Sequence, residues 1–334
     1  NFVTGTPGLA SLARLAAGVD RRRELPSFAP MTLQQWFSRR GGTTRPNGPP
    51  VVLFPDTFNN HLHTDVGVAC VEAIEAAGWQ VVMPSGHLCC GRPLYDYGFL
   101  DQAERYLHRV LDALRPHVRA GTPIVGMEPS CLAVFKDELE KMLPYDDDAK
   151  RLARNAMHFG EFFERHNLEV PSMEAKALMW GHCHHRATGG VSDEQAVLSR
   201  MGLEVEPLKG GCCGLAGSWG FESGKYDISM ACGDQALLPA VRKADEREVV
   251  VADGFSCKTQ IEQAGTGRRA LHLAEVMKLA RLGGANGATP EAALGDGRPT
   301  PGAARRALRV ALPVLAGLGG AAGGVTLYAR SRGT

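Results

Sequence analysis

The chain has 334 residues with a formal net charge of +1, and 44% of its residues are hydrophobic. This length and composition predict a globular protein of about two domains, and the near-zero net charge argues against nucleic acid as a partner. Its nine cysteines are an odd number in a chain too long to need disulfides, so we expect reduced thiols, metal ligation and a cytoplasmic setting.

Residues 1–48 are basic and poorly periodic, with arginine runs at 21–23 and 39–40. This pattern predicts a linker that lies over the domain surface, with contact to an anionic partner as the alternative. The chain starts with Asn and shows no signal-peptide pattern. We therefore expect it to be the C-terminal part of a longer polypeptide.

Residues 49–145 have the pattern of one α/β unit. Short apolar runs at 51–54, 80–83 and 123–127 predict strands. Helical periodicity follows each of them, at 62–77, at 98–119 and from 131 to 143. The second and third strands lead to the cysteines at 89, 90 and 131.

Residues 146–172 predict a helical connector, and the pattern then restarts over 173–283. Strands are expected at 177–180, 203–208 and 249–252. Helices are expected around 193–201, 226–241 and 271–280. These strands lead to the cysteines at 183, at 212 and 213, and at 257.

The two units correspond element by element, which indicates an internal duplication. A Cys-Cys-Gly turn follows the second strand of each unit, and a Ser-Cys pair follows the third. The predicted fold is α/β, with two tandem duplicated units and mainly parallel sheets. Because ligands gather beyond the carboxyl ends of parallel strands, the thiols of each unit should converge there.

Residues 284–304 have the composition of a flexible linker, and 305–334 form an apolar tail. Residues 310–329 carry no charge, and twenty residues are long enough to span a bilayer. Several glycines and Pro313 lower the helix propensity of this run. A membrane anchor and a low-complexity tail therefore both stay open.

The second unit offers four thiols, which is the usual ligand number for an iron–sulfur cluster and for structural zinc. The wide spacing and the vicinal pair favour an iron–sulfur cluster over zinc or a metal-free thiol site. Three histidines beside the first thiol should surround the centre and tune its thiols. The thiols are Cys183, Cys212, Cys213 and Cys257, and the histidines are His182, His184 and His185.

The first unit offers only Cys89, Cys90 and Cys131. Where the fourth thiol is missing, the sequence contains His61 and His63, which would suit zinc or a histidine-ligated cluster. The alternative is a degenerate copy that has lost its centre and kept its fold.

Four other residues have simpler expectations. Cys70 and Cys232 lie on apolar faces of predicted helices and should be buried structural thiols. Asp56 and Glu128 close strands at the carboxyl edge, so they are candidates for groups around a centre or for contacts with a substrate. No catalytic residue is predicted.

The motifs resemble the CCG cysteine-rich domain pair. This pair occurs in the B subunit of heterodisulfide reductase, in the iron–sulfur subunit of glycolate oxidase and in the C subunit of anaerobic glycerol-3-phosphate dehydrogenase. The resemblance covers about residues 50–282. The matching segments are 88–95 with 128–131, 181–185 with 211–218, and 253–257.

The chain is most similar to the C-terminal region of fused FAD-linked dehydrogenases of glycolate, D-lactate or D-2-hydroxyglutarate. The resemblance implies an oxidoreductase component that acts on CH–OH groups through a 4Fe-4S cluster on the second-unit thiols. FAD-binding and ferredoxin-type domains or subunits would be its partners, and electrons would pass from flavin to a quinone or another acceptor. The expected location is the cytoplasm, at the inner face of the plasma membrane if the tail is an anchor.

The sequence departs from the heterodisulfide reductase pattern at two points. Glu128 and Gly254 stand where that pattern has the first cysteine of Cys-x-x-Cys, and the first unit lacks its opening cysteine. A five-thiolate cluster and disulfide reduction are therefore not expected. The alternative functions are a zinc-stabilised docking scaffold and a thiol–disulfide redox enzyme.

Overall fold

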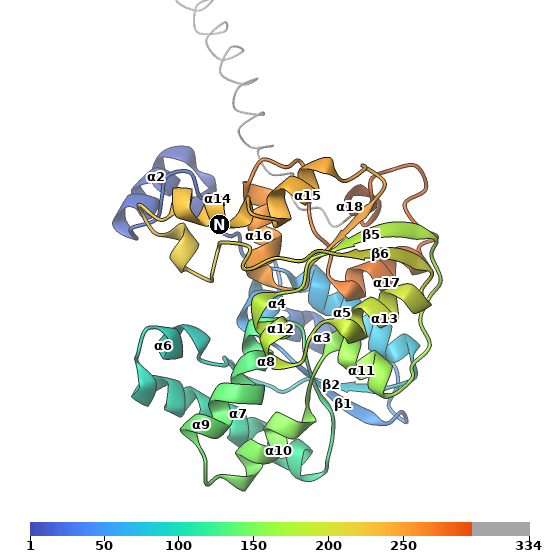
Figure 1. Ribbon diagram of the computed structural model, residues 1–334. Helices are drawn as coiled ribbons and strands as arrows, with labels where there is room; N and C mark the ends of the chain where they lie inside the picture. Colours follow the sequence, from blue (N-terminus) through green and yellow to red (C-terminus); the bar gives the residue numbers. More distant parts are fainter. Residues whose placement is uncertain (296–334) are drawn as a thin grey trace, which may run out of the picture. The chain divides into compact units, whose positions relative to one another are not determined.

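The computed structural model describes residues 1–295, which contain two parallel β-sheets (Figure 1). The first has the strand order β2-β1-β3-β4 and the second the order β6-β5-β7, with every pair parallel. The prediction of a duplicated α/β fold is confirmed. The strands are β1 (Pro50–Phe54), β2 (Gln80–Val82), β3 (Ile124–Gly126), β4 (Ala156–His158), β5 (Ala175–Met179), β6 (Leu203–Pro207) and β7 (Val249–Val251).

The second sheet also repeats the edge of the first. An isolated parallel bridge joins Val251 to Leu271, at the place where β4 lies beside β3 in the first unit. A helix capped by a histidine follows in both units: α11 (Phe159–Arg165) begins after His158, and α17 (Leu273–Arg281) begins after His272. The duplication therefore reaches one element further than the cysteine motifs.

The two sheets share one hydrophobic core. Four helices lie between them, and their apolar faces pack with both sheets in a single cluster (Figure 1). Burial of this apolar surface joins the two units, because each sheet covers one side of the same helices. The four helices are α5 (Thr64–Ala76), α11, α13 (Ser192–Arg200) and α17.

Smaller apolar clusters cover the outer face of each sheet. Over the first sheet lie α7 (Leu100–Arg119), α8 (Pro129–Ala133), the π-turn η1 (Val134–Glu138), α9 (Leu139–Met142) and α10 (Asp147–Asn155). Over the second lie α15 (Leu237–Lys243) and α16 (Phe255–Gln263). The remaining helices are α1 (Phe2–Gly5), α2 (Pro7–Ala16), α3 (Leu33–Arg39), α4 (Thr57–His61), α6 (Arg92–Asp96), α12 (Cys183–Thr188), the 3₁₀ turn η2 (Trp219–Phe221), α14 (Tyr226–Gly233) and α18 (Pro290–Ala293).

The N-terminal segment differs from the linker that the sequence predicts. It forms α1, α2 and α3, and Leu33 is fully buried in the shared core. Leu33 lies so close to Gly67 of α5 that a Cβ at Gly67 would come within 2.3 Å of it. The Arg23 side chain is also fully buried and donates to the Gly220 carbonyl and the Ser229 hydroxyl. The polar composition of the segment hid these two anchoring residues.

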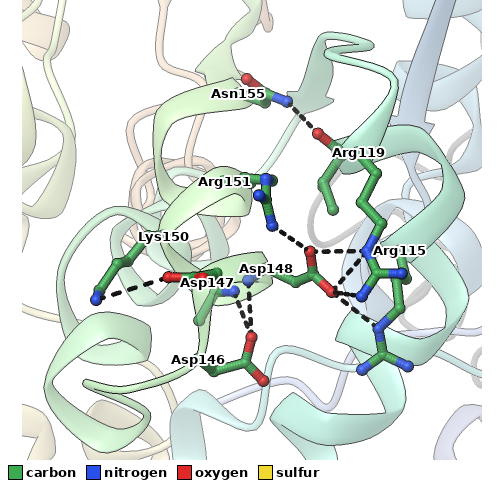
Figure 2. Close-up of polar contacts among 10 residues, drawn as sticks. Arg115, Arg119, Asp146, Asp147, Asp148, Lys150, Arg151 and Asn155 are labelled. Atoms are coloured by element: carbon green, nitrogen blue, oxygen red, sulfur yellow. Dashed lines mark hydrogen bonds and ion pairs between the residues drawn. The ribbon is translucent and has the colours of Figure 1, made fainter.

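The connector at 146–172 is not a single helix. It divides into α10, β4 and α11, and β4 completes the first sheet. The Asp148 carboxylate fixes α10 to α7 by accepting from Arg115 and Arg119, and it also accepts from Arg151 of its own helix (Figure 2). The helical periodicity continued across β4, because a three-residue buried strand has no pattern of its own.

Two further expectations need correction. The helix expected over 226–241 is broken between α14 and α15, and the expected flexible linker at 284–304 contains α18. The apolar run 310–329 lies outside the described residues. Within the part that is described, no helix is both long and apolar enough to cross a membrane.

Candidate metal centre

The four cysteines of the second unit follow three neighbouring parallel strands. Cys183 opens α12 directly after β5, Cys212 and Cys213 lie in the loop after β6, and Cys257 lies in the first turn of α16 after β7. Their thiols form a continuous chain of contacts: Cys183 with Cys212, Cys212 with Cys213, and Cys213 with Cys257. The strand order β6-β5-β7 thus brings four sulfur ligands together.

The four thiols strongly affect each other's pKa. Hydrogen bonds from Cys183 and Cys213 hold the pKa of Cys212 well below its usual value. The same contacts, together with burial, raise the pKa values of Cys183 and Cys213. One thiolate is therefore stabilised at the expense of its neighbours, and full ionisation needs a bound cationic centre.

The loop that carries the vicinal pair is held by close contacts. Gly214 has a φ of 94°, and a Cβ there would lie 2.0 Å from the Ser229 carbonyl oxygen. On the other side, the Arg186 guanidinium donates to the carbonyls of Gly210 and Gly211. Glycine is required at position 214 by both the backbone conformation and the close approach.

The buried Arg23 is a cationic group of the second site that the sequence reasoning missed. Its charge interacts with the Cys213 thiol, and one of its terminal nitrogens is buried without a hydrogen-bond partner. The arginine run at 21–23 was the available signal, but it is typical of a solvated surface segment. Only the fold shows that one arginine points inward.

The three histidines have different surroundings. His182 caps α12 by accepting from the His184 N–H at 3.2 Å, and its ring lies close enough to Cys212 for each to influence the ionisation of the other. His184 Nε2 lies 2.7 Å from an Arg92 nitrogen of the first unit. His185 is buried against Glu194. Burial lowers the pKa of each to about 4, so all three are neutral at pH 7.

The first unit gathers three thiols. Cys90 Sγ lies 3.0 Å from Cys131 Sγ in α8, and the neighbouring Cys89 contacts Cys90. The fourth position belongs to Thr57, which opens α4 after β1 as Cys183 opens α12 after β5. The Thr57 hydroxyl interacts with the Cys89 thiol and has no other hydrogen-bond partner in its buried surroundings.

His61 and His63 are not at that position. His61 Nε2 lies 3.2 Å from the Asn60 amide nitrogen, and its ring is 6.0 Å from that of His87. The His63 ring packs 4.9 Å from the ring of Phe255. The strand end 54–57 was the signal that identifies Thr57, because Asp56 and Thr57 occupy the positions of His182 and Cys183 in the second unit.

Two buried carboxylates lie at the contact between the units. Glu128 caps α8 and accepts from the Phe255 N–H of α16 at 2.8 Å. Asp56 caps α4, and burial together with the charge of Glu128 raises its pKa to about 7. Phe58 stacks on Phe255 with a ring distance of 4.4 Å. Glu128 thereby connects the helix of Cys131 to the helix of Cys257.

Two parallel-stranded units that each present thiols at their strand ends define a duplicated, cysteine-rich metal-binding protein. Residues 56–136 and 183–262 both match the model of the CCG cysteine-rich domain. Two CCG cysteine-rich domains therefore lie in tandem in this chain.

Similar proteins include a dehydrogenase subunit, a dehydrogenase and a lactate utilization protein. The C subunit of the anaerobic glycerol-3-phosphate dehydrogenase of Escherichia coli is 28% identical over 79% of this chain and 67% of its own length. The D-2-hydroxyglutarate dehydrogenase of Pantoea ananatis is 28% identical over 80% of this chain and 27% of its own length. Lactate utilization protein A of Bacillus velezensis is 27% identical over 68% of this chain and 98% of its own length.

The cysteine-rich family and the thiol groups together indicate a metal or iron–sulfur centre. The donor set fits such a centre, since four thiols converge in the second unit and their contacts favour the thiolate form of Cys212. The chain spans about a quarter of the D-2-hydroxyglutarate dehydrogenase, so most of that protein has no counterpart here.

Proposed function

We propose that this chain is the iron–sulfur electron-transfer portion of a flavin-dependent 2-hydroxy-acid dehydrogenase. The observation that carries the proposal is the chain of contacts among four thiols at the ends of three parallel strands. Its relatives are named as dehydrogenases, a dehydrogenase subunit and a lactate utilization protein. The second unit is the site of a 4Fe-4S cluster.

When bound, the cluster supplies one-electron transfer. Cys183, Cys212, Cys213 and Cys257 hold it as thiolates. His182 accepts the His184 N–H at Nδ1, so its neutral ring carries the proton on Nε2 and presents a donor. A donor and the buried Arg23 charge beside the sulfur atoms raise the potential of such a centre.

Substrate oxidation takes place on a partner. An FAD-binding domain or subunit removes hydride from a 2-hydroxy acid such as glycolate, D-lactate or D-2-hydroxyglutarate. A ferredoxin-type domain or subunit passes the electrons on, and this chain delivers them to a quinone or another acceptor. The family resemblance and the names of the relatives support this division of labour.

Anaerobic reconstitution with iron and sulfide tests the proposal. The wild-type chain should gain iron, acid-labile sulfide and an EPR signal on reduction, and Cys212→Ser should lose those of the second unit. Cys232→Ser is the matched control, because this half-buried thiol lies on α14 outside the thiol chain. A chain that gains no iron, or a Cys212→Ser variant with unchanged iron, contradicts the proposal.

The first unit holds a separate zinc ion on Cys89, Cys90 and Cys131. Three thiolates with one open position suit tetrahedral zinc, and the buried Thr57 hydroxyl faces the remaining side. Zinc analysis of the reconstituted protein distinguishes this from a second cluster. Purified protein with zinc and no iron in either unit would favour a docking scaffold instead.

The chain works in the cytoplasm, and residues 310–329 attach it to the inner face of the plasma membrane. Twenty residues without a charge support this, with arginines on both flanks. Cell fractionation with and without residues 305–334 tests it. Equal amounts of both forms in the supernatant contradict the anchor.

A further inference from the structure

A second group of metal-ligating side chains lies in the interior, besides the thiols. His185 of α12, Glu194 in the first turn of α13 and Asp253 after β7 each offer a ligand atom. These atoms all lie within 4.8 Å of one another. His185 Nε2 is 3.2 Å from Glu194 Oε2. Three elements of the second unit therefore meet at one polar point.

Glu194 is the most unusual member of the group. Its residue is 3% exposed, and neither carboxylate oxygen accepts a hydrogen bond. A first-turn glutamate normally faces solvent, where the helix dipole stabilises it. Here the side chain lies against α11 at Gly160, where a Cβ would come within 2.8 Å of Oε1. The glycine makes room for the carboxylate, which lies beside His185 Nε2.

The surroundings disfavour a negative charge on this carboxylate. Burial and the negative charge of Asp253 raise the pKa of Glu194 well above its usual value. Two buried or half-buried lysines of the surrounding elements are engaged with other carboxylates, Lys136 with Glu161 and Lys258 with Glu275.

His158, the residue before α11, lies beside this group of ligands. Its ring stacks on that of His185 with 3.5 Å between centroids. His158 caps α11 by accepting a backbone N–H at its ring, so the neutral ring has its proton on Nε2. That nitrogen is buried without a partner, and it is a donor rather than a ligand.

We propose that His185, Glu194 and Asp253 bind one divalent first-row cation. One imidazole and two carboxylates suit Mn²⁺, Fe²⁺ or Zn²⁺, whereas thiolate sites select zinc and iron–sulfur clusters. The cation offsets the charge of the buried Glu194, which otherwise costs several kcal/mol, while the half-buried Asp253 also accepts from the Leu273 N–H at 2.9 Å. It also ties α12, which carries Cys183, to the segment before α16, which carries Cys257.

Mn²⁺ is the probe that separates this site from the thiols, because it prefers oxygen and nitrogen ligands. Titration of the reconstituted whole chain, followed by EPR of free Mn²⁺, should show one bound ion per chain. Glu194→Gln should weaken binding by at least about tenfold. Asp193→Asn is the matched control, since this half-buried carboxylate is the adjacent residue and lies outside the group. Cys212→Ser should bind Mn²⁺ as the wild type does.

Thermal unfolding with and without Mn²⁺ gives a second readout. The ion should raise the unfolding temperature of the wild type and of Asp193→Asn but leave Glu194→Gln unchanged. If Glu194→Gln does not fold, His185→Gln replaces it. A wild type that binds no Mn²⁺, or a Glu194→Gln variant that binds it equally, overturns the site. The site is also overturned if Glu194→Gln is more stable than the wild type and the wild type binds no Mn²⁺. Glu194 is then a buried neutral acid.

Discussion

Replacing Gly254 with alanine should disturb the second thiol site through a single steric contact. Gly254 immediately precedes α16, and its φ of −78° is open to any residue. A Cβ at this position would lie 2.3 Å from Cδ2 of His182, about 1.1 Å inside the closest ordinary contact of 3.4 Å. His182 cannot move freely, because its Nδ1 caps α12 and α12 begins with Cys183.

The cost follows from overpacking a buried site. Overpacking by one methyl group typically costs about 1–3 kcal/mol, and we expect Gly254→Ala to lower the free energy of unfolding by this amount. Displacement of His182 also moves the first residue of α12, so iron retention after reconstitution should fall. Urea unfolding followed by circular dichroism, together with iron analysis, measures both effects.

Gly211→Ala is the matched control. Gly211 lies in the same thiol loop, and a Cβ there meets nothing within 4 Å. Its unfolding free energy and iron content should stay close to wild type. If Gly254→Ala and Gly211→Ala behave alike, the contact with His182 does not determine the site, and the steric reasoning is refuted.

Two further predictions concern the first unit. The Arg119 guanidinium, followed by Arg151 and Arg115, lowers the pKa of Asp148 to about 2, below the usual value of about 3.9. The stability that the ionised carboxylate contributes is present above about pH 4 and is lost as the pH falls through 2. Asp148→Asn lacks this contribution, so its free energy of unfolding in urea should fall less than that of the wild type between these pH values. Gly126→Ala should cost about 1–3 kcal/mol in urea unfolding, because its Cβ would lie 1.5 Å from Leu132 Cδ2; an unchanged midpoint would contradict this.

The sequence contains enough information to predict the duplicated fold. Apolar runs such as 51–54 and 249–251 are bounded by turn residues, and the thiols follow them in the same order in both units. β4 escaped detection because it has three residues and lies between two helices whose periodicity continues through it. Local pattern cannot show that a short buried segment pairs with β3, because that pairing is a long-range contact.

Local sequence patterns could not predict side-chain contacts between residues that lie far apart in the chain. Thr57 was overlooked because a hydroxyl does not belong to the usual ligand types, although it follows β1 as Cys183 follows β5. Arg23 was assigned to the surface on composition, and its burial depends on Gly220 and Ser229, about 200 residues away. His61 and His63 were chosen because imidazole is a common ligand, but proximity in sequence did not place them at the fourth position.

The two thiol groups differ most in the charges around them. In the first unit, the hydrogen bond with Cys90 lowers the pKa of Cys131, but burial and the charges of Asp56 and Glu128 outweigh it and raise the pKa to about 12. In the second unit, Arg23 lies near Cys213 and no carboxylate occupies position 254. A first thiolate is therefore less costly in the second unit, where contacts with Cys183 and Cys213 hold the pKa of Cys212 well below its usual value. The duplication preserved the scaffold, while the capping and neighbouring residues gave the two thiol groups different electrostatic surroundings.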